Sequence, residues 1–140
     1  MLLRCVFFVA GRFALARSYE GKGMQDSAIA YAQEVVQLSG DVLFFVVDLA
    51  HAYAAAGRKD DAMRVLTQLL ETANHRYVDP CYVAQIYAGL NDSEQALHWL
   101  EKASIGRSAW VAFLGTDPWF DKLRPDPRFR DLLRRMNFSA

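Results

Sequence analysis

The sequence predicts an all-α protein built from three copies of a helix hairpin, followed by a C-terminal helical cap. Two observations carry this prediction: a 34-residue internal period, and aspartate–proline pairs that begin helices in the second half of the chain. The 140 residues suit one domain, in which we expect repeats at about residues 9–40, 43–74 and 77–108 and a cap at residues 109–138.

Four positions recur every 34 residues. They comprise a small residue and a tyrosine in the first helix of each copy, a turn residue, and an alanine in the second helix. They are, in that order, Ala16, Ala50 and Ala84; Tyr19, Tyr53 and Tyr87; Gly23, Gly57 and Asn91; and Ala28, Ala62 and Ala96. Small residues let two helices approach closely. The turn residue needs a left-handed backbone, which glycine adopts freely and asparagine tolerates better than most.

Turn and capping residues set the expected helix boundaries. We expect Asp41 to be the N-cap of the first helix in the second copy. Asp79 and Pro80 are expected to be the N-cap and the first helical residue of the first helix in the third copy. The first of the six repeat helices is expected to end near residue 21. The other five are expected to span about residues 26–38, 41–56, 59–72, 80–90 and 93–103.

The last part of the chain does not follow the period. We expect a short apolar helix at residues 109–114, which includes Trp110. Asp117-Pro118 and Asp126-Pro127 then predict a short helix at about 119–123 and a last helix at 127–136. Helix capping explains these aspartates better than metal binding does. Repeat arrays need an atypical terminal unit that covers the last exposed face, and this segment is expected to supply it.

The four columns resemble the tetratricopeptide repeat over about residues 9–108. The resemblance implies a right-handed superhelical solenoid that binds other proteins. The early aromatic residue of the family pattern is replaced by Arg12, Val46 and Pro80. Residues 76–138, with the run DPWFDKLRPDPRF, resemble the C-terminal tails of bacterial regulatory or signalling proteins. An alternative is therefore a detached regulatory tail of a larger bacterial signalling or transcription-control system.

Composition argues against several other functions. The 16 basic residues balance 16 acidic ones, so we expect no nucleic-acid partner. The three histidines have no second ligand at a helical spacing, and no serine–histidine–acid set is present, so we expect no metal, no cofactor and no enzymatic activity. A hydrogen bond between His51 and Asp48, three residues apart in one helix, is interpreted as structural.

The cysteines and the apolar N-terminus bear on location. Cys5 and Cys81 lie far apart, and we expect both to be free and buried, as in a cytosolic protein. Gly11 and Arg12 interrupt the apolar start, so we expect no signal peptide. No run approaches the ~18 apolar residues that a membrane span needs. We therefore expect a cytoplasmic protein with no membrane association.

The first helix of each hairpin is expected to line a concave groove for a peptide or partner helix. The inward positions predicted from the register are Phe13, Arg17, Val47, Asp48, His51, Tyr82 and Gln85. Some family members grip a peptide carboxylate with lysines and asparagines at such positions; these residue types are absent here, so we expect no such clamp. The alternative is that these side chains simply pack against their neighbours.

Apolar residues at the N-terminal end of the stack predict a second surface. Large exposed apolar patches usually mark an interface, so we expect a homodimer formed by stacking or helix exchange. The residues expected to form it are Leu2, Leu3, Val6, Phe7 and Phe8. The alternative is that residues 1–10 fold back and cap the stack themselves.

Overall fold

The structure is a computed structural model that describes residues 2–106, 108 and 114–136. These residues form seven α-helices and one 3-10 helix, and none of them lies in a β-strand. The all-α helical-repeat prediction is therefore confirmed. The chain divides into two compact units, residues 1–65 and 66–140, and the fourth helix spans the boundary between them.

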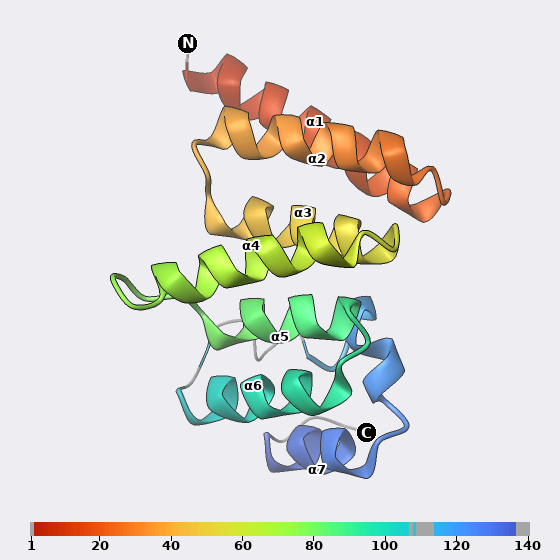
Figure 1. The fold of residues 1–140 in the computed structure, drawn as a ribbon, viewed down its shortest axis with the longest axis vertical. Coiled ribbons are helices and arrows are strands. Elements are labelled where there is room, and N and C mark those ends of the chain that lie inside the picture. The colour runs from red at the N-terminus through yellow and green to blue at the C-terminus, as the bar shows by residue number, and fades with distance from the viewer. Residues whose placement is uncertain (1, 107, 109–113, 137–140) are drawn as a thin grey trace. The chain divides into compact units, whose positions relative to one another are not determined.

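The first unit contains α1 (Leu2–Gly21), α2 (Gln25–Ser39), α3 (Leu43–Ala55) and the start of α4 (Lys59–Thr72). Within it, α1 packs along α2, and α2 packs on α3 (Figure 1). Small residues at the contact are almost fully buried, including Ala16 and Ala28 of the repeat columns. The rings of Tyr19 and Tyr31 stack with centroids 5.5 Å apart, so the first tyrosine of the column fills space between the two helices of its hairpin.

The N-terminal apolar residues are the first turns of α1. The helix runs without a break from Leu2 to Gly21. Residues 2–10 therefore do not fold back over the stack, and the self-capping alternative is wrong. The expected end of this helix near residue 21 is confirmed.

The turn column has the predicted backbone. Gly23, Gly57 and Asn91 have φ values of 72°, 77° and 62°, all in the left-handed region. The prediction for Asp41 is wrong, because Gly40 and Asp41 both have positive φ, 71° and 60°, and together lengthen the turn. The N-cap of α3 is then Val42, whose side chain makes no capping hydrogen bond.

The second unit contains the end of α4, then α5 (Pro80–Gly89), α6 (Ser93–Ile105), the 3-10 helix η2 (Pro118–Leu123) and α7 (Pro127–Arg135). The aspartate–proline prediction is confirmed at all three sites. The carboxylates of Asp79, Asp117 and Asp126 each accept a hydrogen bond from the backbone N–H two residues later, at 2.9, 2.9 and 2.8 Å. The expected helix at residues 109–114 falls largely on residues 109–113, including Trp110, which lie outside the described residues.

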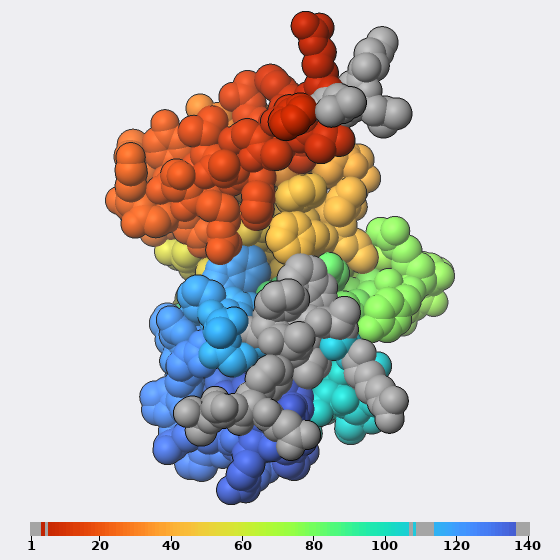
Figure 2. All heavy atoms as spheres, turned by 180° about the vertical axis from the view of Figure 1, so that it is seen from behind, coloured from red at the N-terminus to blue at the C-terminus, as the bar shows by residue number. Residues whose placement is uncertain are grey.

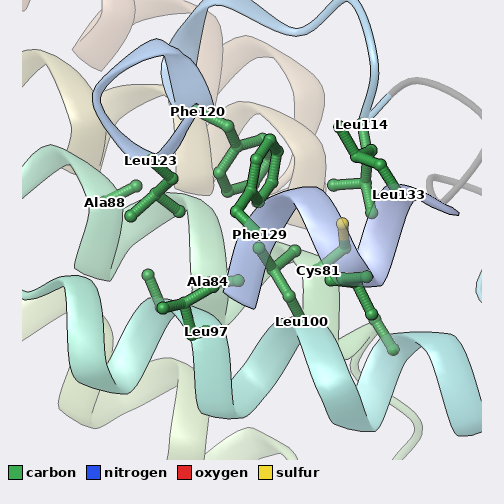
Figure 3. Packing of buried hydrophobic residues seen from close by; sticks show 13 residues of the cluster. Cys81, Ala84, Ala88, Leu97, Leu100, Leu114, Phe120, Leu123, Phe129 and Leu133 are labelled. Carbon is green, nitrogen blue, oxygen red and sulfur yellow. The ribbon is translucent and has the colours of Figure 1, made fainter. Parts of the chain in front are cut away.

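The C-terminal segment takes the place of a shortened fourth hairpin. η2 packs on α5, and α7 packs on α6 (Figure 1). Two ion pairs join α6 to α7 at a separation of 34 residues, which is the repeat period: Glu94 with Arg128 and Glu101 with Arg135. Figure 3 shows the resulting core, in which Phe120 and Phe129 are completely buried. η2 and α7 therefore pack on the third hairpin in register with the 34-residue period.

Candidate protein-binding surface

A polar cluster joins α1 to α3 on the predicted groove side. Arg17 Nη1 donates to Asp48 Oδ1 at 3.0 Å, and His51 Nδ1 lies 3.1 Å from Glu20 Oε1. Arg17 also lies 3.6 Å from Glu20. The structure therefore brings three predicted groove residues together, with Glu20 as a fourth. Sequence reasoning missed Glu20, although Arg17–Asp48 and Glu20–His51 share the same 31-residue spacing.

Burial and charge act in opposite directions on the two carboxyl groups. Burial raises the pKa of Asp48, against the opposing effect of the Arg17 guanidinium. Burial alone would also raise the pKa of Glu20. However, the hydrogen bond and charge interaction with His51, with the charge of Arg17, outweigh burial and lower that pKa. The Arg17 side chain remains 40% exposed, so its guanidinium reaches the surface of the unit.

In the third hairpin, one predicted groove residue contacts the chain's own C-terminal segment. Gln85 is buried, and its Nε2 donates to Asp117 Oδ2, the N-cap of η2, at 3.1 Å. Tyr82 is half-buried. In the first unit Val47 is also buried, only 1% exposed. Gln85 and Val47 are therefore largely excluded from water in the structure.

Cys81 lies in the same buried face of α5. Its thiol is free, and burial raises its pKa to about 12, with the charge of Asp79 as the next cause. A thiol of this kind is not reactive near neutral pH. The prediction of a free buried cysteine is confirmed for Cys81, whereas the side chain of Cys5 lies outside the described residues.

An apolar hollow opens near the N-terminal ends of α1 and α3. We call it the N-terminal hollow; its volume is about 460 Å³. It is lined by Val6, Val9, Ala10, Phe13, Ser39, Phe44 and Phe45. Figure 2 shows the red residues of α1 above the yellow-orange start of α3 on one face of this unit. The rings of Phe13, Phe44 and Phe45 pack against one another with centroids 5.4–5.7 Å apart, which makes a rigid aromatic wall.

Large apolar side chains beside the hollow are exposed to solvent. Val6, Phe7 and Phe8 are 64%, 71% and 51% exposed. The guanidinium of Arg12 lies over the Phe8 ring at 4.6 Å, and Arg12 also pairs with Glu34 at 3.0 Å. Phe8 is therefore held against its own hairpin, whereas Phe7 projects. Leu2 and Leu3 were also predicted to form the self-association surface, but their side chains lie outside the described part of the structure.

The described part of the chain holds neither a metal-binding cluster nor a membrane-spanning helix. It contains no cluster of three or more histidine, cysteine or acidic side chains arranged to hold a metal ion. No helix in it is both long and apolar enough to cross a bilayer.

The fold and the 34-residue period define an α-helical repeat protein. Residues 10–41 and residues 47–76 each match a family model described as a tetratricopeptide repeat. These two segments of the chain are therefore tetratricopeptide repeats. No curated protein and no solved structure matches it. Repeats of this family generally mediate protein–protein interactions and are typically not enzymatic.

Proposed function

We propose that the chain is an adaptor or scaffold that binds a peptide or helix of another polypeptide chain along the face formed by α1 and α3. The observation that carries this proposal is the N-terminal hollow, an apolar cavity of about 460 Å³ bordered by exposed aromatic side chains. Contiguous exposed apolar surface on a folded domain usually marks an interface.

The hollow and the polar cluster follow one another along the same two helices. Phe13 and Arg17 are one turn apart in α1, and Phe45 and Asp48 are one turn apart in α3. A bound segment would place an apolar side chain in the hollow and a polar group beside the exposed part of Arg17. An amphipathic helix or an extended segment with one large apolar residue has this character.

Site-specific photo-crosslinking in cells tests the proposal. We expect p-benzoylphenylalanine at position 6 to give a discrete adduct with a protein, because Val6 borders the hollow and is mostly exposed. The matched control is the same amino acid at position 63, since Met63 is an exposed apolar residue of α4 outside this face. A Phe45→Ser change, which opens the wall of the hollow, should weaken the adduct at position 6.

Equal, diffuse labelling at positions 6 and 63 would contradict the proposal. The identity of an adduct would also separate two biological roles. A sensor kinase or a transcription regulator as the captured protein would support the alternative that the chain is a regulatory tail of a larger bacterial signalling or transcription-control system. We propose a cytoplasmic location for both roles.

A further inference from the structure

We infer that the N-terminal hollow takes Phe7 of a second copy of the chain, in a two-fold contact in which each copy gives one phenyl ring and receives one. The inference rests on the proposed function, since it names the partner of the same face. It makes the chain a homodimer through the first hairpin.

The first argument is shape. One short stretch of α1 carries both a projecting ring and part of a cavity: Phe7 is 71% exposed, while Val6, Val9 and Ala10 line the hollow. A two-fold contact brings the same patch of both copies together, so a patch that holds a projection and a cavity side by side is complementary to itself. A phenyl ring also suits the aromatic wall of Phe13, Phe44 and Phe45, where edge-to-face contacts are favourable.

The second argument is charge. The residues that line the hollow carry no ionisable side chain. Arg12 of α1 pairs with Glu34 of α2 within one copy at 3.0 Å, and Arg4, two residues before Val6, is exposed to solvent. Contact between the linings of two hollows therefore buries no charged lining side chain, which would be costly if unpaired.

The third argument is area. At about 200 Å² for a phenylalanine side chain, Phe7 and Phe8 together leave roughly 250 Å² in water on each copy. A standard interface takes about 800 Å² from each partner. Other exposed apolar side chains of α1, α2 and the α2–α3 connection are Val6, Leu15, Leu38 and Val42. Phe7 and Phe8 alone thus account for roughly a third of the area of a standard interface, which is its central part and not the whole of it.

The test is the solution mass of the purified chain, measured by light scattering after size exclusion over a range of micromolar concentrations. We expect the wild type to have the mass of two chains. Phe7→Ser removes the projecting ring, and Ala10→Trp fills the hollow. Each should weaken association by roughly thirtyfold or more, as expected for the central residue of an interface. Met63→Ser, the same kind of change on α4, should leave the mass unchanged.

Mixing the two variants tests the reciprocal contact. The Phe7→Ser chain keeps an open hollow, and the Ala10→Trp chain keeps its ring, so a heterodimer regains one of the two insertions. The mixture should therefore associate more tightly than either variant alone and less tightly than the wild type. Circular dichroism confirms that each variant is folded, which is expected because positions 7 and 10 are exposed. Failure of the mixture to associate would overturn the reciprocal insertion.

A wild-type chain that remains monomeric would overturn the inference as a whole. If crosslinking at position 6 still captured a different protein, the proposed function would stand without the second copy. If both the mass and the crosslinking were negative, the proposed function would fail as well.

Discussion

The first and third hairpins share one repeat pattern, yet their outer faces differ. In the third hairpin, α5 and α6 are covered by η2 and α7, and the side chains between them are excluded from water (Figure 3). In the first hairpin, α1 leaves Phe7 mostly exposed beside an open hollow. The repeat therefore specifies the hairpin and leaves open what covers its outer face. The chain covers one hairpin with η2 and α7 and leaves an apolar face of the other exposed.

The largest expected effect on stability comes from comparing a phenylalanine on each of the two faces. Phe120 is completely buried, so Phe120→Ala should lower the free energy of unfolding by about 3–5 kcal/mol. Phe7→Ala removes a ring that is mostly in water, and at concentrations where the chain is monomeric it should change the same quantity by less than about 0.5 kcal/mol. Urea denaturation measures both. Similar losses for the two variants would mean that the two faces do not differ as described.

Replacing each of two glycines with alanine should change the stability by an intermediate amount, with opposite signs at the two positions. Gly57 has φ 77° in the repeated turn, so Gly57→Ala should cost about 1–2 kcal/mol. Gly11 lies within α1, and an added Cβ would meet nothing in the chain. Gly11→Ala should therefore stabilise the chain by about 0.5–1 kcal/mol. Thermal unfolding in a Phe7→Ser background separates these effects from association. A destabilising Gly11→Ala would indicate that this face is packed within the chain.

The smallest expected effect concerns the polar cluster. Because the pKa of folded Asp48 is raised, the ionised carboxyl destabilises the fold, and this group's contribution to stability falls as the pH rises above 3.8. The pKa of folded Glu20 is lowered, so its contribution is present above pH 4.5 and is lost as the pH falls through the lowered value.

The matched variants are Asp48→Asn and Glu20→Gln. The stability of the wild type relative to Asp48→Asn should decrease as the pH rises through this range, whereas its stability relative to Glu20→Gln should increase. Unfolding measured from pH 3 to pH 7 checks both signs. Equal slopes for the two variants would contradict the assigned pKa directions.

Local chemistry made most of the fold predictable from the sequence. The second helix of the second hairpin was expected at about residues 59–72, and α4 spans Lys59–Thr72. The aspartate–proline pairs and the turn column were predictable because each depends on the backbone within a few residues. Asp41 was mispredicted for a local reason too: a second left-handed residue after Gly40 moved the N-cap to Val42.

The candidate site was less predictable because it depends on contacts between helices. The register placed Phe13, Arg17, Asp48 and His51 on facing positions, but it could not indicate that Gln85 would bond to Asp117, which belongs to a segment outside the period. Nor did it predict the N-terminal hollow, whose wall needs Phe44 and Phe45 as well as Phe13. The residues of the hollow come from three helices, and their packing fixes its size.

The C-terminal helices η2 and α7 also bear on how many copies of the chain could assemble. An array whose two outer faces were both open could add copies head to tail without limit and form a filament. Here η2 and α7 already occupy the outer face of the third hairpin, and the ion pairs of Arg128 and Arg135 with α6 secure α7 there. If the inferred contact through the first hairpin forms, association is then complete at two copies, and a closed pair is favoured over a fibre.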